Sequence, residues 1–194
     1  MSKRALRVQD AEGYLLHAVA WRETSLLIQV FTREYGNVAL VAKGAKRPHS
    51  ILRPVLSAFQ PLLLSWTGVG EVKTLTRAEC AGIRPLAGRA YMSAWYMNEL
   101  LLRLLPREDE HPVVYEAYDA ALGRLAGDLP AASALRRFEW VLLNETGYSL
   151  GDETPDFDDP QLEPALRLSL RERLNELLQR PLQTRKVLME LQKY

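Results

Sequence analysis

The sequence contains a single cysteine, Cys80, among its 194 residues. One thiol can form neither an internal disulfide nor a thiolate zinc cage, so disulfide-stapled folds and structural zinc sites are excluded. The apolar clusters at 61–64 and 100–105 fall far short of the roughly 18 residues of a membrane span. Asp10 and Glu12 interrupt the one stretch that looks like a secretory signal. We therefore expect a cytoplasmic protein with no metal, cofactor or membrane contact.

Motifs of catalysis and nucleotide binding are also missing. The three histidines, His17, His49 and His111, have no carboxylate or cysteine at a ligand or catalytic spacing. The glycine turn at 68–70 lacks the rest of a dinucleotide fingerprint, and no P-loop motif is present. The acids of 151–160 do not have the frame of a calcium loop. We expect a protein that is not an enzyme; the alternative is a hydrolase whose acids converge only in the fold.

Charge is distributed unevenly along the chain. The net charge of +1 is the sum of two unequal contributions. Residues 1–80 have 11 basic and 6 acidic residues, and residues 81–194 have 14 basic and 18 acidic residues. The two parts therefore carry +5 and −4. This asymmetry indicates two modules, of which the first faces a polyanion.

The hydrophobic period changes near Pro85. Before it, short runs with the period of strands alternate with turn residues, at 14–20, 25–32, 38–42, 56–66 and 71–79. After it, apolar residues recur every three to four positions over 86–105, 112–125, 131–146 and 162–179, with a last helical piece at 184–192. We predict an α+β chain in which a five-stranded barrel at 1–82 precedes an all-helical domain at 83–194, with Gly147 as a helix C-cap and an exposed loop at 151–160.

One stretch of the first part, Val38–Arg53, has an unusual composition. A strand of small and β-branched residues runs into a loop that contains Gly44 and Pro48, four cations and no acid; the cations are Lys43, Lys46, Arg47 and Arg53. We expect this loop to be flexible and to contact a polyanion. The alternative is a hairpin connection with solvated charges.

Six segments carry a family likeness. They are Trp21–Leu27, Leu40–Lys46, Gln60–Leu64, Gly70–Leu75, Tyr96–Leu101 and Leu135–Glu139. In this order they resemble the bacterial recombination mediator RecO. The resemblance implies an OB-fold barrel followed by helices, and it implies binding of single- and double-stranded DNA at the nucleoid. It also implies annealing of strands coated by single-strand-binding protein (SSB), and loading of RecA together with RecR. Some relatives have a four-cysteine zinc motif after the third helix, where this chain has only its short acidic loop.

On this barrel, the candidate phosphate contacts are the cations Arg22, Arg33, Lys43, Lys46, Arg47, Arg53, Lys73 and Arg77. Tyr35, beside a turn, is the candidate for base stacking, whereas core packing is expected for most other aromatic residues. Many cations and few base readers predict sequence-tolerant, mainly electrostatic binding. An OB-fold RNA-binding module with a helical partner-binding domain is the alternative.

The resemblance places a dock for the acidic SSB tail on the helical domain. Arg136 matches the family position, and beside Phe138 and Leu142 its guanidinium suits a peptide that ends in a carboxylate and an aromatic ring. Arg103 is a second candidate. Alternatively, Arg136 and Arg137 solvate a core helix or pair with acids like Glu139 across a neighbour.

Overall fold

The computed structural model describes residues 6–127, 131–151, 153–178, 180–184 and 187. The chain divides into two compact units. The barrel unit comprises the chain up to Arg84 together with Pro106–Pro112, and the helical unit comprises Pro85–Leu105 and the chain from Val113. Within the described part, no helix is long and apolar enough to cross a membrane.

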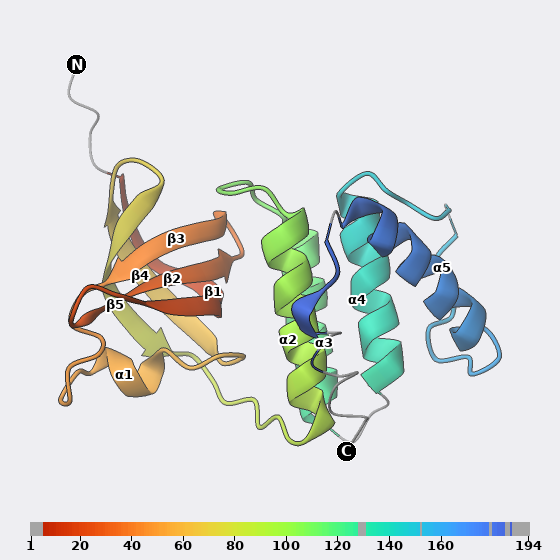
Figure 1. The fold of residues 1–194 in the computed structure, drawn as a ribbon, viewed down its shortest axis with the longest axis horizontal. Helices are drawn as coiled ribbons and strands as arrows, with labels where there is room; N and C mark the ends of the chain where they lie inside the picture. Colours follow the sequence, from red (N-terminus) through yellow and green to blue (C-terminus); the bar gives the residue numbers. More distant parts are fainter. Residues whose placement is uncertain (1–5, 128–130, 152, 179, 185–186, 188–194) are drawn as a thin grey trace. The chain divides into compact units, whose positions relative to one another are not determined.

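The barrel unit is a closed five-stranded barrel (Figure 1). Its strands are β1 (Leu6–Trp21), β2 (Ser25–Thr32), β3 (Gly36–Ala42), β4 (Pro61–Gly68) and β5 (Val72–Cys80), arranged in the order β1-β2-β3-β5-β4. All neighbours are antiparallel except β3 and β5. The alternate side chains that fill the barrel are mainly aliphatic, and Trp66 is the largest of them. The predicted five-stranded OB-type barrel is thus confirmed.

Two strands of the barrel begin elsewhere than predicted: β1 at Leu6 rather than 14, and β4 at Pro61 rather than 56. The prediction missed residues 6–13 of strand β1, which begins at Leu6. The pairing of β1 with β4 shifts register between Val8 and Ala11, and this shift interrupts the alternation of side chains along the strand. Asp10 at this irregularity has a φ of +50°. A short helix, α1 (Leu52–Val55), lies in the segment between β3 and β4, and its Leu52 and Val55 pack against the barrel core. Its single turn is too short to give a helical period.

The helical unit contains α2 (Arg89–Leu104), α3 (Pro112–Ala126), α4 (Ala131–Glu145) and α5 (Glu163–Leu177). This confirms helices in all four predicted places. Gly147 ends α4 with a φ of +82°, and the N–H of Tyr148 donates to the carbonyl of Leu143 over 2.8 Å, as in a glycine C-cap. The predicted last helical piece at 184–192 lies outside the described residues except at 184 and 187.

The connection between α2 and α3 belongs to the barrel unit, which the proposed boundary at 82/83 missed. The N–H of Glu108 donates to the carbonyl of Asn37 over 3.0 Å. Gly36 has a φ of +60°, and a Cβ there would lie 1.8 Å from the carbonyl oxygen of Asp109. The contact therefore depends on a glycine 73 positions earlier in the chain, and no local period in 106–112 could reveal it.

Candidate nucleic-acid interface

The segment Lys43–Arg53, here called the cationic loop, is held by its own turns and by the barrel. Ala45 is buried in the barrel core. The N–H of Lys46 donates to the carbonyl of Thr24 over 2.9 Å, and that of Arg47 donates to Gly44 over 3.0 Å. These contacts form consecutive turns along the loop. The predicted flexibility of the loop stays a prediction.

The cations of this loop face solvent. Lys43, Lys46, Arg47 and Arg53 are all exposed, as is Arg22 in the turn between β1 and β2. The hydrogen bond from Lys46 to Thr24 brings that turn beside the cationic loop. Among the residues that the structure describes, none of these five cations forms an ion pair with a carboxylate. Their charge is therefore available to an external anion, which is the property that phosphate binding requires.

Two other predicted phosphate contacts are exposed but already have carboxylate partners. Arg33 lies 3.6 Å from Glu12. Arg77 pairs with Glu79 at 2.6 Å and with Asp10 at 3.7 Å, and the hydrogen bond that Arg77 donates to Glu79 raises the pKa of Arg77. Because a phosphate would compete with these acids, Arg33 and Arg77 offer less net positive potential than the cationic loop.

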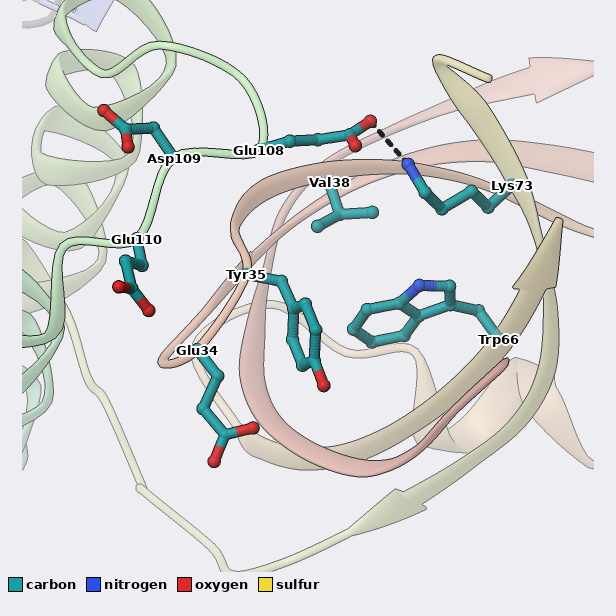
Figure 2. Close-up of a pocket in the computed structure, with 8 residues that line it drawn as sticks. All are labelled: Glu34, Tyr35, Val38, Trp66, Lys73, Glu108, Asp109 and Glu110. Carbon is teal, nitrogen blue, oxygen red and sulfur yellow. Dashed lines mark hydrogen bonds and ion pairs between the residues drawn. The ribbon is translucent and has the colours of Figure 1, made fainter. Parts of the chain in front are cut away.

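Lys73 and Tyr35 lie elsewhere, in a pocket with an acidic lining (Figure 2). The Lys73 side chain is 6% exposed; its ammonium donates to Glu108 over 2.5 Å and to the carbonyl of Gly70 over 3.1 Å. Tyr35 is half-buried with its ring edge-on to Trp66, at 5.2 Å between centroids. These positions do not favour either residue as a phosphate or base contact: Lys73 is buried in an ion pair, and Tyr35 lines a pocket with four carboxylates.

Trp21 was not among the predicted contacts, yet it is an exposed aromatic residue next to Arg22. It ends β1 next to Arg22, pairs with Ser25 across the turn, and is 44% exposed. Tyr14 and Phe31, in contrast, are fully buried, as core packing predicted. The exposed end of a strand next to an arginine was the signal available in the sequence.

The proposed peptide dock on the helical unit requires correction. Phe138 and Leu142 lie on the inner face of α4 with no exposed surface, and Phe138 packs edge-on against Tyr118 at 6.0 Å. Arg136 is also buried and lies 3.2 Å from Glu139. Arg136 thus pairs with an acid of its own helix, and these positions face the helical core rather than solvent.

Arg103, the second candidate for the dock, is engaged by its own unit. It pairs with Glu99 at 2.7 Å and donates to the carbonyls of Arg180 and Pro181. Glu99 also accepts hydrogen bonds from the segment at 183–184. Burial alone would raise the pKa of Glu99, but these hydrogen bonds and Arg103 lower it overall.

The acidic loop at 151–160 is attached to the helices by Phe157 and Asp158. Phe157 is buried, and the guanidinium of Arg137 lies 4.9 Å from its ring centroid. Asp158 accepts from Ser133 and pairs with Arg124 at 2.8 Å, and these contacts lower its pKa, the Ser133 hydrogen bond most. Among the described residues, no group of three or more potential ligands is placed to hold a metal ion.

Comparison with known proteins gives matches over both units. The family model described as "Recombination protein O N terminal" matches residues 6–84, and "Recombination protein O C terminal" matches 86–151. Curated relatives include the DNA repair protein RecO of Cupriavidus metallidurans, which is 57% identical over 150 residues, 77% of this chain and 50% of that protein. DNA repair protein RecO of Aromatoleum aromaticum is 56% identical over 147 residues, 75% of this chain and 61% of that protein.

The chain spans about half to three fifths of the length of these curated relatives. The two family models follow each other along the chain, and their junction at 84–86 coincides with the boundary between barrel and helical units. The barrel, the helical unit and the sequence identity to the curated relatives all lead to the same conclusion: the chain belongs to the RecO family of recombination proteins.

Proposed function

We propose that this chain is a DNA-binding recombination mediator in DNA repair that acts without catalysing a reaction of its own. The observation that carries the proposal is the group of exposed cations without carboxylate partners, within the described residues, on the cationic loop and at Arg22. The names of the relatives, DNA repair protein RecO, supply the cellular context. In this role the chain works at the nucleoid on single- and double-stranded DNA.

The cationic loop explains how binding and annealing can coexist. Contacts to phosphates fix a strand without reading its sequence, and they leave the base edges free to pair with a second strand. Each phosphate contact to single-stranded DNA contributes about −0.7 to the slope of log affinity against log salt. Four to six contacts therefore give a slope of about −3 to −4.

The protein partners of the proposed function are SSB, RecR and, indirectly, RecA. Family membership supports them, and the reaction would be annealing of SSB-coated strands and assistance to RecR in loading RecA. The buried residues Arg136, Phe138 and Leu142 are not part of this proposal. An SSB tail would have to bind to other, exposed side chains.

The test is annealing of complementary DNA strands that have been coated with SSB. We expect the protein to accelerate duplex formation, and we expect an RNA competitor of the same sequence to inhibit less than the DNA strand. No acceleration, with RNA bound as tightly as DNA, would instead indicate an RNA-binding module. Cleavage of either strand that requires a divalent metal would show that the protein is a hydrolase.

Trp21 provides a separate prediction for base stacking. Stacking of a base on an aromatic ring contributes about 1–3 kcal/mol, so Trp21→Ala should weaken binding of single-stranded DNA roughly 5- to 150-fold. The salt slope should not change, because no charge is removed. Fluorescence anisotropy of a labelled oligonucleotide measures both quantities.

Two variants control this experiment. Trp21→Phe keeps an aromatic face and should recover most of the affinity. Trp95→Ala removes a similarly exposed tryptophan from the helical unit and should have little effect. Equal affinities for Trp21→Ala and the unmodified protein would remove Trp21 from the interface.

A further inference from the structure

The barrel unit contains a pocket of about 330 Å³ at the end of β2 where the chain turns into β3. Its volume lies at the lower limit of ligand pockets, which suits a side chain or short peptide segment better than a large ligand. Four carboxylates line it, Glu34, Glu108, Asp109 and Glu110 (Figure 2). The single cation in the lining, Lys73, is already paired with Glu108. The pocket therefore favours a cationic ligand and disfavours DNA.

The backbone holds these carboxylates in place. Glu108 has a left-handed φ of +55°, and its N–H donates to Asn37 over 3.0 Å. The close approach of Gly36 to the carbonyl of Asp109 holds the other side of the segment. Such a strained, doubly anchored segment is typical of a preorganised binding site.

Trp66 supplies an independent indication of a ligand. Its side chain is 1% exposed, and its indole Nε1 is buried and has no hydrogen-bond partner among the described residues. Figure 2 shows this nitrogen turned toward the side of the pocket where Lys73 and Glu108 lie. A buried donor without an acceptor costs about 1–3 kcal/mol. A carbonyl oxygen from a bound ligand would remove that cost.

The charge and the free donor together define the ligand. It must carry positive charge for the carboxylates and a neutral acceptor for Trp66. A metal ion offers no acceptor to Trp66. It also has no binding geometry here, because no three potential ligands within the described ranges are placed to hold one. An arginine in a peptide meets both, since its planar guanidinium has five donors and its main chain has carbonyls.

We propose that this acidic pocket binds an arginine-containing segment of a partner protein. The guanidinium lies among Glu34, Asp109 and Glu110 and against the ring of Tyr35, where a cation is attracted to the aromatic face. A main-chain carbonyl of the same segment accepts a hydrogen bond from Trp66 Nε1. The role of this pocket is separate from DNA binding by the cationic loop.

The test uses the indole N–H resonances of the ¹⁵N-labelled protein, which has four tryptophans, Trp21, Trp66, Trp95 and Trp140. The probe is the capped peptide Gly-Arg-Gly-Arg-Gly, and the control peptide has citrulline, an uncharged isostere, at both arginine positions. The Trp66 resonance is assigned with Trp66→Phe. If that variant does not fold, Phe substitutions of the other three tryptophans assign it by elimination.

We expect the arginine peptide to shift the Trp66 resonance in a saturable manner and the citrulline peptide to bind at least about tenfold more weakly, a difference of about 1.4 kcal/mol. The double variant Asp109→Asn, Glu110→Gln should also bind the arginine peptide at least about tenfold more weakly. Glu23→Gln is the control, since it removes an acid at the opposite end of β2 and should leave the affinity unchanged.

Three results would overturn the proposal. The first is a Trp66 resonance that does not move at saturating arginine peptide. The second is equal binding of the arginine and citrulline peptides. The third is a shift of the same resonance by a single-stranded oligonucleotide but not by the peptide, which would make the pocket part of the DNA surface. None of these results depends on whether the protein anneals DNA.

Discussion

Replacing Lys43, Lys46, Arg47 and Arg53 together by alanine should reduce the affinity for single-stranded DNA roughly 600-fold at about 0.1 M salt. These four cations are exposed, and within the described chain they have no carboxylate partner. If each contacts one phosphate, the salt slope should become less steep by about 2.8. The measurement is a series of anisotropy titrations between about 0.05 and 0.5 M salt.

A matched pair of double variants distinguishes the cationic loop from charge in general. One double variant is Lys46→Ala with Arg47→Ala, and the other is Arg33→Ala with Arg77→Ala. Each double variant removes two positive charges from the barrel unit. The first should flatten the slope by about 1.4. The second should flatten it much less, because Arg33 and Arg77 already pair with carboxylates. Identical slopes for the two variants would show that DNA responds to net charge and not to the cationic loop.

Truncating Phe138 to alanine should destabilise the helical unit by about 3–5 kcal/mol. The ring is completely buried and packs against Tyr118, whose hydroxyl donates to Asn98. Its removal leaves a cavity in the centre of the unit. Leu142→Ala should cost about 2–5 kcal/mol for the same reason. Urea unfolding followed by circular dichroism measures both values.

The control for Leu142→Ala is Leu168→Ala, which makes the same substitution at a leucine of α5 that is 56% exposed. It should change stability by no more than about 0.5 kcal/mol. A labelled acidic SSB-tail peptide provides the second measurement. If Leu142→Ala kept full stability but no longer bound the peptide, the original assignment of this face as a dock would be correct and the core assignment wrong.

The parts of the fold that could be predicted are those in which neighbouring residues along the chain show a regular hydrophobic pattern. β-Branched and aromatic residues in 25–32 indicate β2, and the three-to-four spacing in 131–146 indicates α4. Exposure of the cations at 43–53 also followed from local composition. The burial of Phe138 did not, because a helical period identifies which residues share a face but not whether that face meets the core or a partner.

The candidate site was predictable only in part for a related reason. Lys73 and Tyr35 looked like the other candidates in the sequence, and what distinguishes them is the return of 106–112 to the barrel. That contact joins residues far apart in the chain. Trp21 was overlooked because the same residue type can fill a core, as Trp66 does, or lie at an exposed strand end.

The length of strand β2 affects how the barrel unit orients as DNA approaches it. It has eight residues, so its ends are separated by roughly 23 Å. The cationic turn and loop meet one end, and the acidic pocket lies at the other. The barrel unit is thus an electric dipole, on which an approaching polyanion exerts a torque that presents the cationic end first. Salt above a few hundredths molar should progressively weaken this orientation, because the screening length, about 30 Å at 0.01 M and about 10 Å at 0.1 M, then becomes shorter than the strand.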